Sequence, residues 1–149
     1  MAIKINTEKR IFTLETKHTM YQMQADTYGV LRHLWYGAKT GCDMSYLQDY
    51  PDVGFSGNPH DAGNDRTYSL DTLPLEYAGA GIGDFRVPAV EAVHADGSCA
   101  LDLRYYSHTV KQGKYAIAGL PALYAGEDEA ETLEVVLRDT ASAVEVTLK

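Results

Sequence analysis

A segment rich in aromatic and polar residues lies between Gly41 and Gly83, and its side chains are of the types that bind sugars. Aromatic rings stack on the apolar C–H faces of a sugar, while forked polar groups bind its hydroxyls. The residues of this kind are Tyr50, Asp52, Phe55, Asn58, Asp65 and Arg66. Loops of this length are often functional. The composition predicts a sugar-facing loop, with the alternative that Asn64, Asp65 and Arg66 only tie the loop down.

Other spacings that would support catalysis or cofactor binding are missing from the sequence. The five histidines are scattered, and no two are spaced to hold one metal ion. No serine stands in a Gly-x-Ser-x-Gly elbow, and no cysteine has the electropositive setting of a nucleophile. The glycine-rich stretch 79–83 lacks the Lys-Ser/Thr of a phosphate loop, so it predicts a turn. We expect no metal, no cofactor and no catalytic residue in this chain.

The elements that position these residues are predicted to be β-strands, because apolar and polar residues alternate in short runs. Run 19–25 alternates in this way and is followed by turn residues at 26–29. The next run, 30–36, is rich in bulky residues that pack well on a pleated sheet. These two runs predict a hairpin, and runs 132–138 and 144–148 predict another near the end of the chain.

A third hairpin is predicted around Asp96-Gly97-Ser98, because Asp-Gly between apolar runs favours a tight turn. Its two strands are expected at 86–95 and 100–110. No window of helical length keeps an apolar stripe at helical spacing. We therefore predict an all-β fold, an antiparallel β-sandwich, in a single domain over residues 1–149. The long segment 41–83 is expected to be an ordered excursion that packs on this domain.

Composition excludes several classes of partner. The 149 residues carry 13 Lys and Arg against 21 Asp and Glu, a formal net charge of −8. Nucleic-acid binding and anionic membrane surfaces both require basic groups, so neither partner is expected. The sequence has no apolar stretch long enough to span a bilayer and no signal peptide, which indicates a cytoplasmic protein. Cys42 and Cys99 have no paired spacing, so two free thiols are expected.

Two long motifs stand out in the sequence: Asn-Asp-Arg-Thr-Tyr-Ser-Leu-Asp-Thr-Leu-Pro-Leu-Glu-Tyr at 64–77 and Gly-Ile-Gly-Asp-Phe-Arg-Val-Pro-Ala at 81–89. Shorter characteristic segments lie at 19–21, 34–37, 119–122 and 131–135. Together they resemble the N-terminal domain of bacterial α-galactosidases of glycoside hydrolase family 36. The resemblance covers nearly the whole chain in the order of the family.

The resemblance implies an enzyme larger than this chain. Members of the family have an N-terminal β-supersandwich, a central (β/α)₈ barrel and a C-terminal β domain, and they hydrolyse terminal α-galactosides such as melibiose and raffinose with retention. Two carboxylates about 5–5.5 Å apart perform such a reaction. The family's nucleophile lies in a Lys-Trp-Asp-type motif of the barrel, whereas the single tryptophan here, Trp35, stands in Leu-Trp-Tyr-Gly. The isolated chain is expected to be inactive.

The resemblance also implies where sugar and neighbouring domains lie. In tetrameric members a loop of this domain reaches the active site of a neighbouring subunit, and the matching segment here is 52–66. Asp52, Phe55 and Arg66 are therefore the expected substrate-proximal residues. The residues expected to form a structural or interdomain motif are Asn64, Asp65, Asp71, Glu76, Asp84 and Arg86. The segment departs from the commoner family pattern around Gly54, Gly57 and His60.

Two functions from different classes remain open at this point. The first is the N-terminal, non-catalytic part of a retaining α-galactosidase, which supplies oligomer or interdomain contacts and one wall of the sugar pocket. The alternative is a stand-alone carbohydrate-binding or protein-interaction module. In either case a partial sandwich leaves strand edges exposed, and exposed edges favour self-association. A homo-oligomer is therefore expected.

Overall fold

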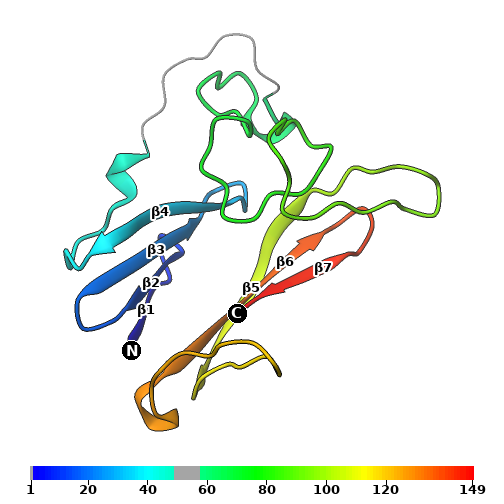
Figure 1. Cartoon of the computed structure of the whole chain (residues 1–149). Helices are drawn as coiled ribbons and strands as arrows, with labels where there is room; N and C mark the ends of the chain where they lie inside the picture. Colours follow the sequence, from blue (N-terminus) through cyan, green and yellow to red (C-terminus); the bar gives the residue numbers. More distant parts are fainter. Residues whose placement is uncertain (1, 49–57) are drawn as a thin grey trace.

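The computed structural model describes residues 2–48 and 58–149, and seven β-strands lie within them (Figure 1). The first four strands are β1 (Ala2–Asn6), β2 (Ile11–Glu15), β3 (Thr19–Ala25) and β4 (Leu31–Ala38). They form one antiparallel sheet in the order β1-β2-β3-β4. The register of β3 against β4 shifts between Gln22 and Met23. The predicted hairpin of runs 19–25 and 30–36 is confirmed.

The remaining strands form a second antiparallel sheet. They are β5 (Leu103–Gln112), β6 (Glu131–Asp139) and β7 (Glu145–Leu148), in the order β5-β6-β7. The β6–β7 pair confirms the predicted final hairpin. Along β6, buried and partly exposed residues alternate, as a strand with one covered face requires.

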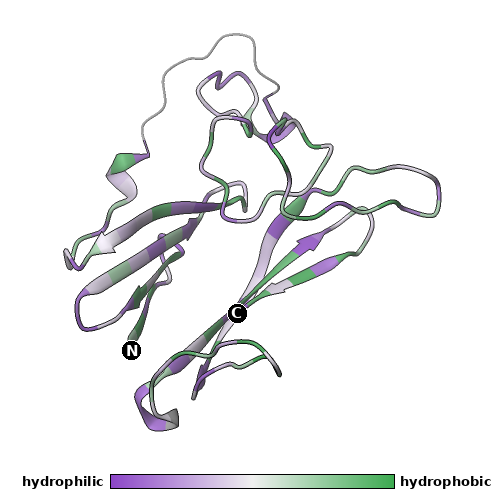
Figure 2. Cartoon of the chain, viewed as in Figure 1, coloured by the Kyte–Doolittle hydropathy of each residue, from purple (hydrophilic) through white to green (hydrophobic). Residues whose placement is uncertain are grey.

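The two sheets pack face to face around one apolar core. Residues from both sheets contribute to it, together with Leu101, which precedes β5: Phe12, Met23, Ala25, Leu31, Leu101, Leu103, Leu133, Val135 and Leu137. The ring of Phe12 is fully buried and lies 4.9 Å from the His108 ring and 5.9 Å from the Tyr105 ring, centroid to centroid. Figure 2 shows apolar and polar stretches following one another along the strands. The predicted all-β sandwich is confirmed.

The hairpin predicted around Asp96-Gly97-Ser98 is wrong. A tight turn does form, because the His94 amide donates to the Ser98 carbonyl at 2.9 Å. Residues 86–95, however, form no strand, and only an isolated bridge joins Val90 to Gly79. The following strand begins at Leu103 and pairs with β6 instead. The long β5–β6 ladder buries apolar residues of β6, and this tertiary gain outweighs pairing of residues 86–95 with the strand after the turn.

Segment 58–102 gathers at one end of the sandwich (Figure 1). It supplies most of a second apolar cluster, formed by Val30, Ala62, Tyr68, Leu70 and Leu73. Close packing continues to Gly79, where a Cβ atom would lie 2.1 Å from the carbonyl oxygen of Leu101. Only glycine fits at that position without a backbone shift.

Helical structure within residues 2–48 and 58–149 consists of three single turns. These 3₁₀ turns are η1 (Ser45–Leu47), η2 (His60–Ala62) and η3 (Glu127–Glu129). A membrane-spanning helix is not among the elements of this described part.

Candidate functional site

Hydrogen bonds within residues 58–68 hold the described part of the predicted sugar-facing loop in shape. The Asn58 amide donates to the Asp65 carbonyl at 2.6 Å. The Asp65 carboxylate accepts from the Thr67 hydroxyl at 2.6 Å and from the Thr67 amide at 3.0 Å. These hydrogen bonds lower the pKa of Asp65, and the bond from the Thr67 hydroxyl has the largest effect. A two-residue Asx turn of this kind fixes the backbone on both sides of residue 66.

Arg66 lies at the exposed surface of this loop. A guanidinium has five donors in a planar fork, which suits the hydroxyls of a sugar or a carboxylate. The other two predicted substrate-proximal residues, Asp52 and Phe55, lie outside the described residues. The structure therefore places Arg66 on an ordered loop beside Asp65 and Asn58.

Asp84 and Arg86 form an ion pair, and Arg86 also closes the 70–73 turn through hydrogen bonds to backbone carbonyls. Arg86 Nε donates to Asp84 Oδ1 and Arg86 Nη2 to Asp84 Oδ2, both at 2.9 Å. The same Nη2 group lies 2.8 Å from the Leu70 carbonyl and 2.7 Å from the Leu73 carbonyl. These hydrogen bonds from Arg86 lower the pKa of the Asp84 carboxyl, which is itself buried. These contacts join residues 84–86 to the 70–73 turn within the chain.

Glu76 joins the loop region to the inner face of the first sheet. Its Oε1 accepts a hydrogen bond from the Tyr21 hydroxyl, and its Oε2 lies 3.4 Å from His33 Nδ1. Burial, followed by the bond to Glu76, raises the pKa of Tyr21. Asp71 accepts from the Ser69 hydroxyl and so closes its own turn, and Asn64 lies exposed in the turn after η2.

Removal of Arg86 is expected to change how stability depends on pH. The folded-state pKa of Asp84 lies below its ordinary value of 3.8, so the pair stabilises the fold above pH 3.8 and loses this effect as pH falls through the lower pKa. Arg86→Met should therefore be less stable than the parent chain at pH 6. The difference should shrink below pH 3.8 to the contribution of the two carbonyl bonds.

Urea unfolding between pH 3 and pH 7 measures this effect. Asp84→Asn is the matched control, because it keeps the side-chain shape but has no carboxyl to titrate. An Arg86→Met difference that stays constant across the whole range would contradict the pairing.

Sequence reasoning missed three residues that hold the loop to the sandwich: Asp26, Tyr68 and Arg104. Asp26 is buried, and its Oδ2 accepts from the Tyr68 hydroxyl at 2.6 Å. Burial and then this bond raise the pKa of Tyr68. Arg104, on β5, lies 3.8 Å from Asp61 of η2. One signal for Asp26 was present in the sequence, because an Asp in a turn commonly accepts hydrogen bonds from nearby backbone amides. No local pattern indicates that its other partner, Tyr68, lies 42 residues away.

A polar cleft of about 520 Å³ lies at the base of the loop. Its lining includes Gln24, Asp26, Tyr28, Arg32, Asp65 and Tyr68. Within the described ranges, no three His, Cys, Asp or Glu side chains come together as metal ligands. The arrangement can bind a polar ligand through arginine, carboxylate and tyrosine groups.

Comparison with known proteins identifies the family to which this chain belongs. Residues 29–149 match the model of the glycosyl hydrolase family 36 N-terminal domain. The chain belongs to this family. It is 53% identical over 99% of its length to the bifunctional α-galactosidase/sucrose kinase AgaSK of Mediterraneibacter gnavus, and 41% identical over its full length to α-galactosidase AgaA of Geobacillus stearothermophilus. It spans 16% and 20% of the lengths of these relatives.

Solved structures of family 36 enzymes share the fold. The galactosidase domain of AgaSK superimposes with a TM-score of 0.92 and 52% identity, covering 99% of this chain and 20% of that domain. AgaB of G. stearothermophilus has a TM-score of 0.85 and 43% identity, with coverage of 99% and 20%. Two structures of AgaA variants hold raffinose and stachyose; each has a TM-score of 0.82 and 41% identity, with coverage of 93% and 19%. The family 36 chain thus spans about a fifth of the length of these solved chains.

Proposed function

We propose that this family 36 chain is the N-terminal, non-catalytic part of a retaining α-galactosidase that acts on terminal α-galactosides of the melibiose and raffinose type. The observation that carries the proposal is identity above 50% over nearly the whole chain to an α-galactosidase. AgaA variants with 41% identity are complexed with raffinose and stachyose, which supports the substrate class. The acid/base and nucleophile of the reaction would lie in the part of the enzyme beyond this domain.

Within that enzyme, the 58–68 loop would form one wall of the sugar pocket. Arg66 is the residue for this role, because it is exposed on a loop whose backbone is fixed on both sides by Asp65. A fixed backbone reduces the conformational entropy lost when an arginine binds a ligand. Asp52 and Phe55 would complete the wall.

Exposed apolar residues support contacts with other domains or subunits. A group of them lies between β5 and β6: Tyr115, Ile117, Leu120, Leu123 and Tyr124. Apolar surface concentrated in this way is typical of interaction surfaces. We propose that the enzyme is a homo-oligomer and that it works in the cytoplasm.

The sugar-wall role can be tested in a chimera in which this chain replaces the matching N-terminal part of the AgaSK galactosidase domain. Arg66→Ala should raise KM for raffinose by about tenfold or more, since hydrogen bonds from a charged group contribute roughly 1.5–3 kcal/mol. Arg138→Ala is the control, because Arg138 lies on β6 and pairs with Glu145 through Nε at 2.5 Å. Equal KM values for the two variants would contradict the role of Arg66.

The isolated chain provides the test against the alternative function. A pocket wall should neither hydrolyse p-nitrophenyl α-galactoside nor bind raffinose measurably, because it lacks the rest of the pocket. Saturable raffinose binding by the chain alone, measured by calorimetry, would instead indicate a carbohydrate-binding module.

A further inference from the structure

The turn between β3 and β4 is the point where the first sheet holds the 58–68 loop. Asp26 begins this turn, and its Oδ1 accepts from the amides of Tyr28 and Val30, both at 2.9 Å. Its Oδ2 accepts from the hydroxyl of Tyr68, which lies two residues beyond Arg66. The Arg32 Nε group, 3.5 Å from Oδ2, balances the buried charge. One carboxylate thus fixes both its own turn and the far end of the loop.

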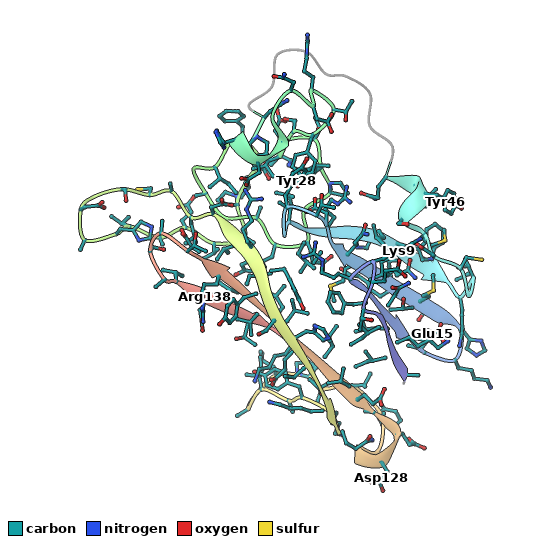
Figure 3. The ribbon with its side chains drawn as sticks, turned by 180° about the vertical axis from the view of Figure 1, so that it is seen from behind. Lys9, Glu15, Tyr28, Tyr46, Asp128 and Arg138 are labelled. Atoms are coloured by element: carbon teal, nitrogen blue, oxygen red, sulfur yellow. The ribbon has the colours of Figure 1, made fainter. Side chains whose placement is uncertain are left out.

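The same turn is bonded to the second sheet. The Gly29 carbonyl accepts from the Tyr105 amide at 2.7 Å, and the Tyr28 carbonyl accepts from Arg104 Nη1 at 3.1 Å. Figure 3 shows Tyr28 where the loops meet the ends of the sheets. Gly29 has a φ of +80°, and a Cβ there would lie 3.5 Å from Arg104 Cβ, so glycine suits this close approach. The turn therefore connects the loop to both sheets.

Arg104 holds the near end of the loop. Its Nε and Nη2 groups bind Asp102 at 2.5 and 3.0 Å, and Nη2 also lies 3.8 Å from Asp61 of η2. Only 16% of the Arg104 side chain is exposed, so its direction is set by packing as well as by these bonds. Asp61 and Tyr68 lie on either side of Arg66 in the chain. The segment that carries Arg66 is therefore joined to the sandwich by a hydrogen bond at Tyr68 and by a longer ion pair at Asp61.

These contacts are separable from those that hold the sandwich together. The sandwich core lies around Phe12, whereas Tyr68 packs in the second cluster, with its ring 4.7 Å from that of Tyr28. Loss of the Tyr68 hydroxyl or of the Arg104 fork should therefore leave the sandwich core intact. It removes the bonds that place the loop relative to the sheets.

We propose that Asp26, Tyr68 and Arg104 are positioning residues that hold the 58–68 loop in one place and thereby set the affinity of the enzyme for α-galactosides. The inference rests on the proposed function, because it requires Arg66 to face the sugar. None of the three residues needs to touch substrate. A displacement of about 1 Å in a binding group is enough to lower affinity strongly.

The test uses Tyr68→Phe and Arg104→Met in the AgaSK chimera, with two measurements on each variant. Hydrogen exchange of the amides of residues 62–68 should become about tenfold faster in Tyr68→Phe, which loses a hydrogen bond that closes the segment. In Arg104→Met the exchange should rise by a smaller factor, because this variant loses an ion pair of 3.8 Å to an exposed carboxylate. KM for raffinose should rise several-fold, with a smaller change in kcat. The kinetic parameters of p-nitrophenyl α-galactoside should change in the same direction.

Matched controls remove equivalent bonds elsewhere. Tyr105→Phe removes a hydroxyl that lies 2.6 Å from His108 Nδ1, and Arg138→Met removes a guanidinium paired with Glu145. Both should leave loop exchange and KM unchanged. Arg104→Lys keeps the positive charge but not the planar fork, so it should raise KM less than Arg104→Met does. It also provides a folded variant if Arg104→Met fails to fold.

The outcomes separate this proposal from the function on which it rests. Unchanged loop exchange in Tyr68→Phe and in the Arg104 variants would overturn it, because these residues would not hold the loop. Faster exchange with an unchanged KM, in a chimera where Arg66→Ala raises KM, would also overturn it. If Arg66→Ala leaves KM unchanged, the sugar-facing role fails first, and the positioning proposal fails with it.

Discussion

Replacement of Asp26 by alanine should lower the free energy of unfolding by about 3–5 kcal/mol, the range for removal of one partner from a buried ion pair. The carboxylate accepts three hydrogen bonds, from the Tyr28 and Val30 amides and the Tyr68 hydroxyl. Only 5% of its side chain and 14% of that of Arg32 are exposed. Removal would leave two buried donors, the Val30 amide and the Tyr68 hydroxyl, and the partly buried Tyr28 amide without their acceptor. It would also leave Arg32 without its ion-pair partner, and each such group is costly.

Urea denaturation of the 149-residue chain, followed by the fluorescence of Trp35, measures this loss. Asp96→Ala is the matched control, since Asp96 also holds a turn, accepting from the Ser98 amide at 2.9 Å and from its hydroxyl at 2.7 Å. Asp96 is exposed, so water replaces these bonds and a much smaller loss is expected. Similar losses of unfolding free energy for the two variants would contradict the prediction that the buried position of Asp26 makes its removal more destabilising.

Phe12→Ala should be comparably destabilising, by about 3–5 kcal/mol. The Phe12 side chain is fully buried on β2 and packs against Tyr105 and His108 of β5, so it joins the two sheets. Truncation removes this contact and leaves a cavity that rigid sheets cannot close. For a chain of this size, the melting temperature should fall by about 10 °C or more.

Phe85→Ala tests whether the effect comes from burial. It is the same substitution at a side chain that is 84% exposed, and a surface change of this kind is expected to alter stability by within about 0.5 kcal/mol. Calorimetric melting of the two variants gives the comparison. A Phe12→Ala melting point close to that of Phe85→Ala would contradict a core shared by the two sheets.

The strands that sequence predicted correctly are those whose pattern is local. Alternation over 19–25, 30–36, 132–138 and 144–148 identifies a covered and an exposed face without knowledge of any partner. The Asp-Gly signal at 96–97 is also local, and it correctly marked a turn. It could not show that residues 86–95 would remain outside the sheets, because a strand also requires a partner edge.

The candidate site was predicted in part for the same reason. Arg66 could be selected because its residue type, its place on a long loop and its motif are all visible in the sequence. The residues that hold it could not, since Asp26 meets Tyr68 across 42 positions and Tyr28 meets Arg104 across 76. Nothing in the spacing of such pairs specifies a contact.

The sequence by itself determined the all-β class, the two hairpins that were confirmed and membership of family 36, because alternation, turn residues and motifs are properties of neighbouring positions. The tertiary structure decided that β5 pairs with β6, that Arg86 closes the turn at Leu70 and Leu73, and that the buried carboxylate of Asp26 binds Tyr68 of the loop. These outcomes depend on which distant groups leave water together, and the free energy of burial is set by the assembled fold rather than by any segment of it.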